Sequence, residues 1–140
     1  MGDEVSDERA VPQGKLALAI STAVVRHLAS TTGRGPTKAK TTLGENAVFV
    51  VLQDTLTRGE LNLVQAGESD AVLDLRRLWQ KIMRTSCTRE IEQLTGRTVI
   101  GFMSDNHIDP DIAVEVFILE PLGADPAVRA ALAASDPVSE

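Results

Sequence analysis

Cysteine, tyrosine and long apolar runs are what this sequence has least of. Its 140 residues include one cysteine, no tyrosine and 3% aromatic residues. A lone thiol excludes an internal disulfide, so we predict a protein of a reducing, cytoplasmic compartment with Cys87 as a core thiol. Because aromatic rings are so few, aliphatic side chains must supply the packing of the core.

The apolar runs are too short for a membrane protein. The longest uninterrupted run, residues 47–52, and the run at residues 112–119 that Glu115 interrupts fall well below the ~18 residues that indicate a membrane-spanning helix, which predicts a soluble chain without membrane insertion. Residues 1–13 hold four acids and lack the apolar segment of a secretory signal. We therefore predict a disordered acidic N-terminus at residues 1–12, one domain at 13–120 and an acidic tail at 121–140 with a short helix from Asp125 to Ala134.

The charge of the chain is unevenly distributed. The net charge is −6, but residues 13–104 carry twelve Lys/Arg against eight Asp/Glu, which gives +4, and the remainder carries two against twelve, which gives −10. Acidic ends repel a polyanion, and no run of aromatic side chains lies among the basic residues to stack on bases. Nucleic acid is therefore not an expected partner, whereas a small anion is still compatible with the basic body.

The first half of the chain predicts a helix and a hairpin. Apolar residues recur at helical spacing over residues 14–31, and the helix is expected to end at Gly33. Polar and apolar residues then alternate over residues 37–43, and residues 47–55 are apolar on both faces, as in a central strand. A turn at residues 44–46 joins the two runs into an antiparallel hairpin.

The second half predicts a long helix and another hairpin. Thr57 and Glu60 have the spacing of a capping box, so a helix is expected to begin there and to break or bend at Gly67. An apolar stripe then runs along one helix face to Gly96. Its members are Val72, Leu75, Leu78, Trp79, Ile82, Met83, Cys87, Ile91 and Leu94. A strand at 97–103, a polar loop at 104–111 and a strand at 112–119 complete the chain.

These elements predict the α+β class. We expect a two-layer sandwich, a four-stranded antiparallel sheet with helices on one face, in the order α-β-β-α-β-β. Alternation on the third strand puts an apolar pair on each face, Ile100 with Phe102 and Val99 with Met103. Helices on one face alone would leave the other face apolar and exposed. A homodimer that buries this face is the economical prediction, and a different protein partner is the alternative.

A basic loop is the first candidate site. Gly33, Arg34 and Gly35 precede a proline between helix and strand, and Lys38 and Lys40 follow on one strand face. Such a loop can form a nest for phosphate, carboxylate or bicarbonate. The alternative is a helix stop and strand start with solvated basic neighbours, because the loop lacks the Walker pattern and follows a helix.

A basic stripe on the long helix is the second candidate. Arg77, Lys81 and Arg84 share one side of the helix, with Arg76 nearby. The stripe is either a solvent face with local ion pairs, such as Asp74 with Arg77, or a docking face for an acidic partner.

Metal-binding and catalytic patterns give no candidate. Asp105, His107, Asp109 and Asp111 alternate in the second hairpin, but Pro110 stands where a calcium loop of the EF-hand type needs glycine. A hydrated acidic turn is the preferred interpretation. His27, His107 and Cys87 show no motif that ties them to a nucleophile or a metal. We predict no catalytic residues, no metal and no cofactor.

A set of spaced motifs resembles a known family. Residues Gly33-Arg34-Gly35-Pro36, Leu56-Thr57 with Glu60, Leu94-Thr95-Gly96 and Ser104-Asp105 occur in the order seen in the MpsC-type family, a bacterial domain long without an assigned function. The resemblance covers residues 15–120, although Arg58-Gly59 departs from the residues expected after Leu-Thr. It implies an accessory role in a sodium-translocating, membrane-potential-generating system whose other components are membrane proteins associated with inorganic-carbon supply.

Three functional hypotheses follow from the residues and the resemblance. The first is a non-enzymatic, cytoplasmic, homodimeric accessory or regulatory domain that meets a membrane-protein partner through its sheet face or its helix. The second is a sensor of small anions or nucleotides centred on Arg34, Lys38 and Lys40. The third is an enzyme whose site assembles across a dimer.

Overall fold

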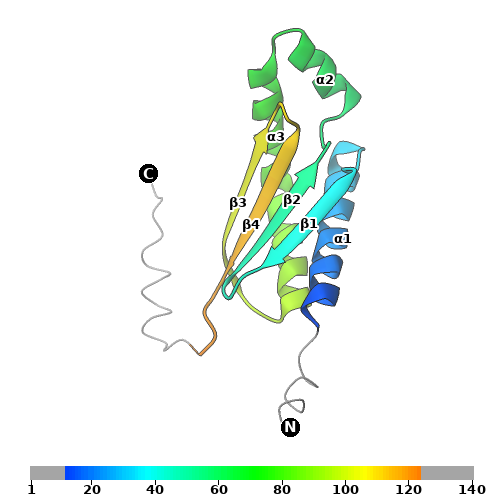
Figure 1. Cartoon of the computed structure of the whole chain (residues 1–140). Helices are drawn as coiled ribbons and strands as arrows, with labels where there is room; N and C mark the ends of the chain where they lie inside the picture. The colour runs from blue at the N-terminus through cyan, green and yellow to red at the C-terminus, as the bar shows by residue number, and fades with distance from the viewer. Residues whose placement is uncertain (1–11, 124–140) are drawn as a thin grey trace, which may run out of the picture.

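Three helices and four strands make up residues 12–123, the part of the chain that the computed structural model describes (Figure 1). In chain order they are α1 (Gln13–Thr32), β1 (Lys38–Leu43), β2 (Ala47–Gln53), α2 (Arg58–Gln65), α3 (Ser69–Thr95), β3 (Val99–His107) and β4 (Ile112–Leu119). The predicted α+β class is confirmed, and two helices occupy the segment between the hairpins. The N-terminal segment at 1–11 and the tail helix lie outside the described residues.

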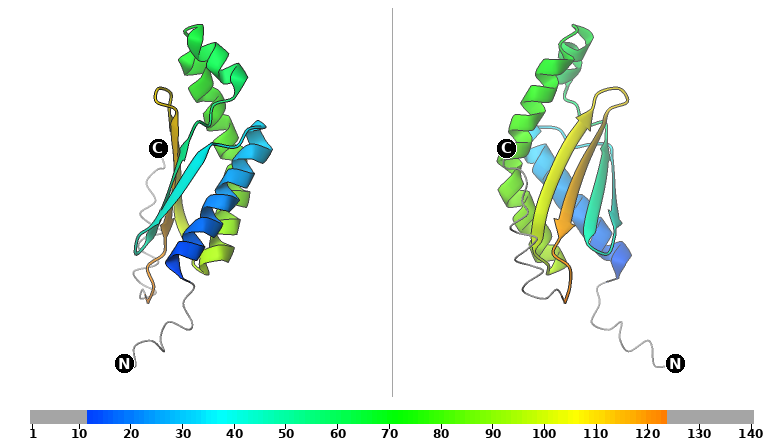
Figure 2. Two further views of the ribbon diagram at one scale, coloured as in Figure 1. Left: turned by 45° about the vertical axis from the view of Figure 1, so that its right-hand side comes forward. Right: turned by 90° about the vertical axis from the view of Figure 1, so that its left-hand side faces the viewer.

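The four strands form one antiparallel sheet in the order β1-β2-β4-β3. The two hairpins join through β2 and β4, the strands that are apolar on both faces, and β1 and β3 are the edges. α1 and α3 cover one face of this sheet, so the molecule has two layers (Figure 2). The other face carries no helix of the described chain, as the sequence predicts.

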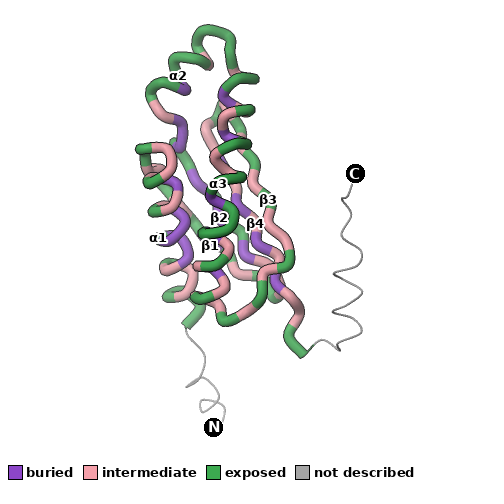
Figure 3. Tube along the Cα trace, turned by 180° about the vertical axis from the view of Figure 1, so that it is seen from behind, coloured by how far each residue is buried: buried purple, intermediate pink, exposed green. Residues whose placement is uncertain are grey.

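The core lies between α1, α3 and the covered face of the sheet. Buried residues recur along both helices between exposed ones (Figure 3). They meet the inward residues of the central strands, and Phe117 and Phe102 pack with ring centroids 5.0 Å apart. The main buried members are Ile20, Val24, Leu28, Val48, Val50, Leu52, Met83, Cys87, Ile91, Phe117 and Leu119.

Local signals place the helix ends where they were expected. α1 ends because Gly33 adopts a left-handed φ of 85° and donates its N–H to the Ala29 carbonyl at 2.8 Å. Thr57 and Glu60 form the predicted capping box at the start of α2. Gly67, with φ of 85°, separates α2 from α3. α2 and the first turns of α3 project beyond the end of the sheet (Figure 1).

The predicted stripe of α3 is partly wrong. Leu78 and Ile82 are 57% and 70% exposed, whereas Arg76 is buried. The buried row of α3 runs through Arg76 and Met83, and Leu78 and Ile82 lie four residues apart on the neighbouring row, which the sheet does not cover. Composition alone did not distinguish these two adjacent rows.

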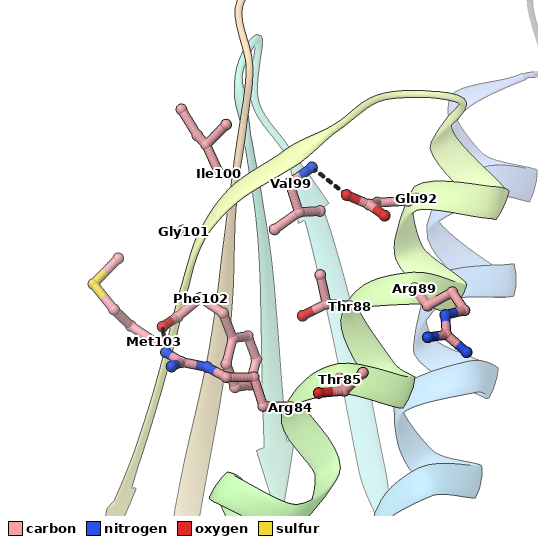
Figure 4. Close-up of a pocket in the computed structure, with 10 residues that line it drawn as sticks. All are labelled: Arg84, Thr85, Thr88, Arg89, Glu92, Val99, Ile100, Gly101, Phe102 and Met103. Carbon is pink, nitrogen blue, oxygen red and sulfur yellow. Dashed lines mark hydrogen bonds between the residues drawn. The ribbon is translucent and has the colours of Figure 1, made fainter. Parts of the chain in front are cut away.

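The predicted third strand is wrong in its length and in its faces. β3 begins at Val99 and continues to His107, so residues 104–107 are strand and not loop. A bulge between Val99 and Gly101 adds a residue on this strand. Val99 and Phe102 consequently both pack on the core, while Ile100 and Met103 point away from α3 (Figure 4).

Candidate interaction surfaces

The uncovered side of the sheet, here called the open sheet face, has no helix of residues 12–123 over it. Its side chains are those opposite in the pleat to the buried core residues. Phe49, Val51 and Met103 are 42%, 40% and 55% exposed there. The face comprises Lys38, Lys40 and Thr42 of β1, Ala47, Phe49, Val51 and Gln53 of β2, Ile112, Val114, Val116 and Ile118 of β4, and Gly101, Met103, Asp105 and His107 of β3.

The Gly33–Pro36 loop has a structural explanation for most of its residues. The Arg34 Nε donates to the Asp54 carbonyl at 3.3 Å, and Asp54 also accepts a hydrogen bond from the Thr37 hydroxyl. The loop follows the C-terminal end of α1, where the helix dipole favours cations and disfavours anions. These contacts lend no support to an anion at Arg34.

Lys38 and Lys40 lie on the open sheet face of the edge strand β1, as their spacing predicts. A shallow hollow of about 610 Å³ beside them is lined by their own strand together with Val51 and Gln53 of β2. Gly33 and Arg34 do not line this hollow. The anion-site hypothesis therefore remains a prediction. Its two groups of residues, the loop around Arg34 and the lysines of β1, lie in different surroundings.

Arg77, Lys81 and Arg84 lie together along a groove between α3 and the edge strand β3. Arg77 pairs with Asp74 at 2.7 Å. Within residues 12–123 no ion pair involves Lys81, Arg84 or Arg89, so three cations of this groove have no acidic partner there. On the α3 side of the groove, positive charges thus outnumber negative ones, and the other side is the edge strand β3.

The groove extends along α3 towards its C-terminal end (Figure 4). This part has a volume of about 950 Å³, a helical wall that includes Arg84 and Arg89, and a strand wall that includes Val99 and Phe102. The Arg84 guanidinium donates to the Phe102 carbonyl at 2.9 Å and lies 5.6 Å from the centre of the Phe102 ring. This hydrogen bond uses one of the five N–H donors of the Arg84 guanidinium and holds the Arg84 side chain at the groove.

Side chains also occupy backbone groups of the exposed edge. The Val99 N–H donates to the Glu92 carboxylate at 2.9 Å, and Arg84 occupies the Phe102 carbonyl. Such caps discourage another strand from adding to an edge. A partner in this groove would therefore be recognised by its side chains more than by its backbone.

A buried ion pair, which the sequence did not indicate, joins α2 to α3. Arg76 and Glu60 are each 2% exposed, and two hydrogen bonds of 2.5 and 2.8 Å join them. Arg76 also donates to the Thr55 carbonyl at 2.7 Å and lies 5.3 Å from the Trp79 ring centre. The capping box was a signal for Glu60, but nothing in the sequence separated Arg76 from the exposed cations beside it.

Asp111 has a structural role that the interpretation as a hydrated acidic turn missed. Its carboxylate accepts hydrogen bonds from the Thr55 N–H, the Thr55 hydroxyl and the Leu56 N–H at 2.9–3.1 Å. The second hairpin is thereby tied to the link between β2 and α2. His107 lies near this turn, and its Nδ1–H donates to the Pro110 carbonyl at 2.8 Å.

Glu115 is a buried acid on the covered face of the sheet. It is 4% exposed, and its Oε2 has no hydrogen-bond partner among the described residues. Burial raises the pKa of Glu115 to about 7, and Ser104 and Arg76 offset only part of this effect. The side chain therefore titrates near neutral pH, inside the core layer.

The candidate nucleophile and histidines have ordinary surroundings. Burial, followed by the charges of Glu115 and Glu90, raises the pKa of the Cys87 thiol to about 12, which suppresses the reactive thiolate. His27 Nε2 lies 2.8 Å from the Glu90 carboxylate, which also pairs with Arg26. No cluster of three potential metal ligands occurs in residues 12–123. The described part of the chain also contains no helix that is both long and apolar enough to cross a membrane.

The fold and its surfaces define a small two-layer α+β domain with one open sheet face and one basic groove. A family model described as "Na+-translocating membrane potential-generating system (MpsC)" matches residues 12–121. The chain therefore belongs to the MpsC family, and the resemblance suggested by the motifs is confirmed. Searches of curated proteins and of solved structures give no significant match.

Proposed function

We propose that this domain is a non-catalytic, cytoplasmic accessory component that docks an acidic segment of a partner protein in the groove between α3 and β3. The observation that carries the proposal is that Lys81, Arg84 and Arg89 line this groove and form no ion pair among the described residues. Glu92 also lines the groove, but its carboxylate accepts a hydrogen bond from the Val99 N–H and pairs with none of these cations. The family description supplies the context, a system that generates membrane potential. A membrane protein of that system with an acidic cytoplasmic segment is the partner that we propose.

The groove favours a ligand that is both acidic and partly apolar. Cations line its helical side, and Val99 and Phe102 contribute apolar surface on its strand side. The distance along the helix from Arg77 to Arg89 is about 18 Å, because a helix rises 1.5 Å per residue. Five or six residues of an extended peptide cover roughly this length. Alternating acidic and apolar side chains would match both walls.

A synthetic peptide tests this docking mode directly. The probe is a fluorescent hexapeptide of alternating glutamate and valine, and binding is followed by fluorescence anisotropy. We expect saturable binding that weakens with added salt, and at least a ~10-fold loss of affinity in the double variant Lys81→Gln/Arg84→Gln. The matched control, Lys15→Gln/Arg58→Gln, removes the same charge from exposed positions elsewhere and should bind as the wild type does.

Two results would contradict docking in the groove. Equal losses in the two double variants would show attraction to overall charge and not to a site. Equal binding of a lysine-valine hexapeptide would show that acidity is not recognised.

The link to membrane potential needs a cellular measurement. Cells that carry Lys81→Gln/Arg84→Gln at wild-type protein levels should show a lower membrane potential by a potentiometric dye. Cells with the control double variant should keep the normal signal. A normal potential in both strains would contradict an accessory role exerted through the groove.

A further inference from the structure

The open sheet face has a charge pattern that its register makes explicit. Residues paired across the four strands form rows, and in one row Lys40, Val51, Val114 and Asp105 follow each other from edge to edge. A cation thus stands on the β1 edge and an anion on the β3 edge, with valines between them. The next row is uncharged and larger: Thr42, Phe49, Val116 and Met103.

This pattern is self-complementary under one symmetry operation. Two copies can stack face to face about a two-fold axis that runs parallel to the strands, which puts β1 of one protomer over β3 of the other and keeps each row over its own counterpart. Lys40 then lies over Asp105 of the second copy, and the reciprocal pair forms on the other side of the axis. Sheets stack about 10 Å apart and cross at about 30°, which a lysine and an aspartate side chain together can bridge.

The other rows are compatible with the same axis. Phe49 of one protomer lies over Val116 of the other, so the centre of the contact is apolar. Lys38 lies over His107 of the second copy. The His107 Nδ1–H donates to the Pro110 carbonyl, so in this tautomer the Nε2 lone pair can accept a hydrogen bond from that lysine.

An axis across the strands would give the opposite result. It would put β1 over β1 and β3 over β3, so that the lysines face lysines and the Asp105 residues approach each other. Like charges in an interface cost affinity and exclude wrong arrangements. The charges on the two edges therefore select one of the two ways in which this face could meet its own copy.

We infer that the open sheet face is covered by a second copy of this chain, stacked about a two-fold axis parallel to the strands with reciprocal Lys40–Asp105 pairs. The assembly leaves the cations of the proposed groove accessible, because they lie on α3 on the other side of the sheet, and the two surfaces meet at Gly101 and Met103. A dimer would present two such grooves, and two linked sites raise the avidity for a partner that is itself multivalent.

The size of the face sets the expected affinity. Four strands about 4.8 Å apart and about seven residues long make a face of roughly 20 by 23 Å. The product, roughly 460 Å² per protomer, is below the ~800 Å² per partner of a standard stable interface. We therefore expect a weak dimer, with a dissociation constant in the micromolar range or above. The oligomeric state must therefore be measured over a concentration series.

The first experiment is multi-angle light scattering or sedimentation of the full chain across that series. We expect a monomer at low concentration and a dimer at high concentration. Phe49→Glu should weaken the dimer at least about 100-fold, because two charges enter the apolar centre. Since Phe49 is 42% exposed, this substitution should leave the fold intact, which circular dichroism checks.

Charge reversal then tests the axis. Lys40→Glu and Asp105→Lys should each weaken the dimer at least about 10-fold, and the double variant should regain most of the loss because the pairs are restored in reverse. Lys15→Glu is the matched control, an exposed charge reversal on α1.

Three results would overturn the inference. A wild-type chain that stays monomeric throughout the series leaves the face to another occupant. A dimer that tolerates Phe49→Glu uses another surface. A double variant no stronger than its single variants rules out this axis. None of these results bears on peptide binding in the groove, so the two proposals can fail separately.

Discussion

The two faces of one sheet contrast more sharply than any two elements of this protein. Phe117 on β4 points to the helices and is fully buried, whereas Phe49 on the neighbouring strand β2 points the other way and is 42% exposed. Both strands alternate between these environments, yet their sequences are apolar at nearly every position. Residue type therefore does not separate the two faces of these strands, and the position of the helices decides which face the single chain buries.

The contrast extends to the charged groups. The covered side holds Glu115 and the Arg76–Glu60 pair away from water, while Lys40 and Asp105 on the open side remain solvated. Charges on the covered side are therefore expected to control stability, and charges on the open side are expected to control association. Substitutions that are matched across the two sides test this division.

The largest expected effect comes from the two phenylalanines. Phe117→Ala should lower the free energy of unfolding by about 3–5 kcal/mol, because it leaves a cavity in the packed layer. Phe49→Ala, the same change on the open face, should cost under ~1 kcal/mol in the monomer. Urea denaturation at a concentration below dimerisation compares them. Equal losses in the two variants would show that the open face is already covered within one chain.

Removing Arg76 should have an effect of similar size. Arg76→Gln leaves the Glu60 carboxylate buried without its cation, which costs about 3–5 kcal/mol. A combined replacement, Arg76→Met with Glu60→Gln, removes both charges but keeps an acceptor for the Thr57 N–H of the capping box, and it should recover much of that loss. The check is denaturation of the two variants beside the wild type. A double variant as unstable as Arg76→Gln would mean that the pair contributes more than the desolvation of its members.

Glu115 predicts a dependence of stability on pH. Its pKa is about 7 in the folded chain against an ordinary value of 4.5, so between these values the folded state holds a proton that the unfolded state has released. Stability should fall as pH rises through this window, by roughly 3 kcal/mol in total. Glu115→Gln should abolish this part of the slope in urea titrations at pH 5 and pH 8. Asp105→Asn, on the open face, should leave it unchanged, and a slope that survives Glu115→Gln would assign it to other groups.

Much of the fold was predictable because its signals are local. Helical spacing, the Thr57–Glu60 capping box and the glycines at helix ends depend on residues a few positions apart. The bulge in β3 has no comparable signal. Its extra residue is defined only by the pairing with β4, and this pairing determines which of Val99, Ile100 and Phe102 face the core.

The candidate sites were predictable only in part, for the same physical reason. The spacing of Lys81 and Arg84 places them on one helix side, but the groove exists because β3 passes beside that side. Arg76 was indistinguishable from Arg77 in sequence, since its burial depends on α2 folding back to present Glu60. Asp111 likewise acts on backbone groups more than fifty positions away.

The smallest predicted effect concerns Arg77, an exposed residue of α3 that directly follows the buried Arg76. Arg77 and Asp74 are paired at 2.7 Å but their side chains are 68% and 74% exposed, so water and salt screen the attraction. Arg77→Gln should therefore change the free energy of unfolding by no more than about 0.5 kcal/mol, and added salt should shrink even that difference. The same substitution removes a cation from the groove and should lower the affinity for the glutamate-valine peptide. The loss should be smaller than that caused by Arg84→Gln, because Asp74 already offsets the charge of Arg77. A decrease of more than ~1 kcal/mol in the free energy of unfolding, measured by urea denaturation, would show that the Arg77–Asp74 pair is shielded from water. The exposed side of α3 would then contribute to stability as its buried side does.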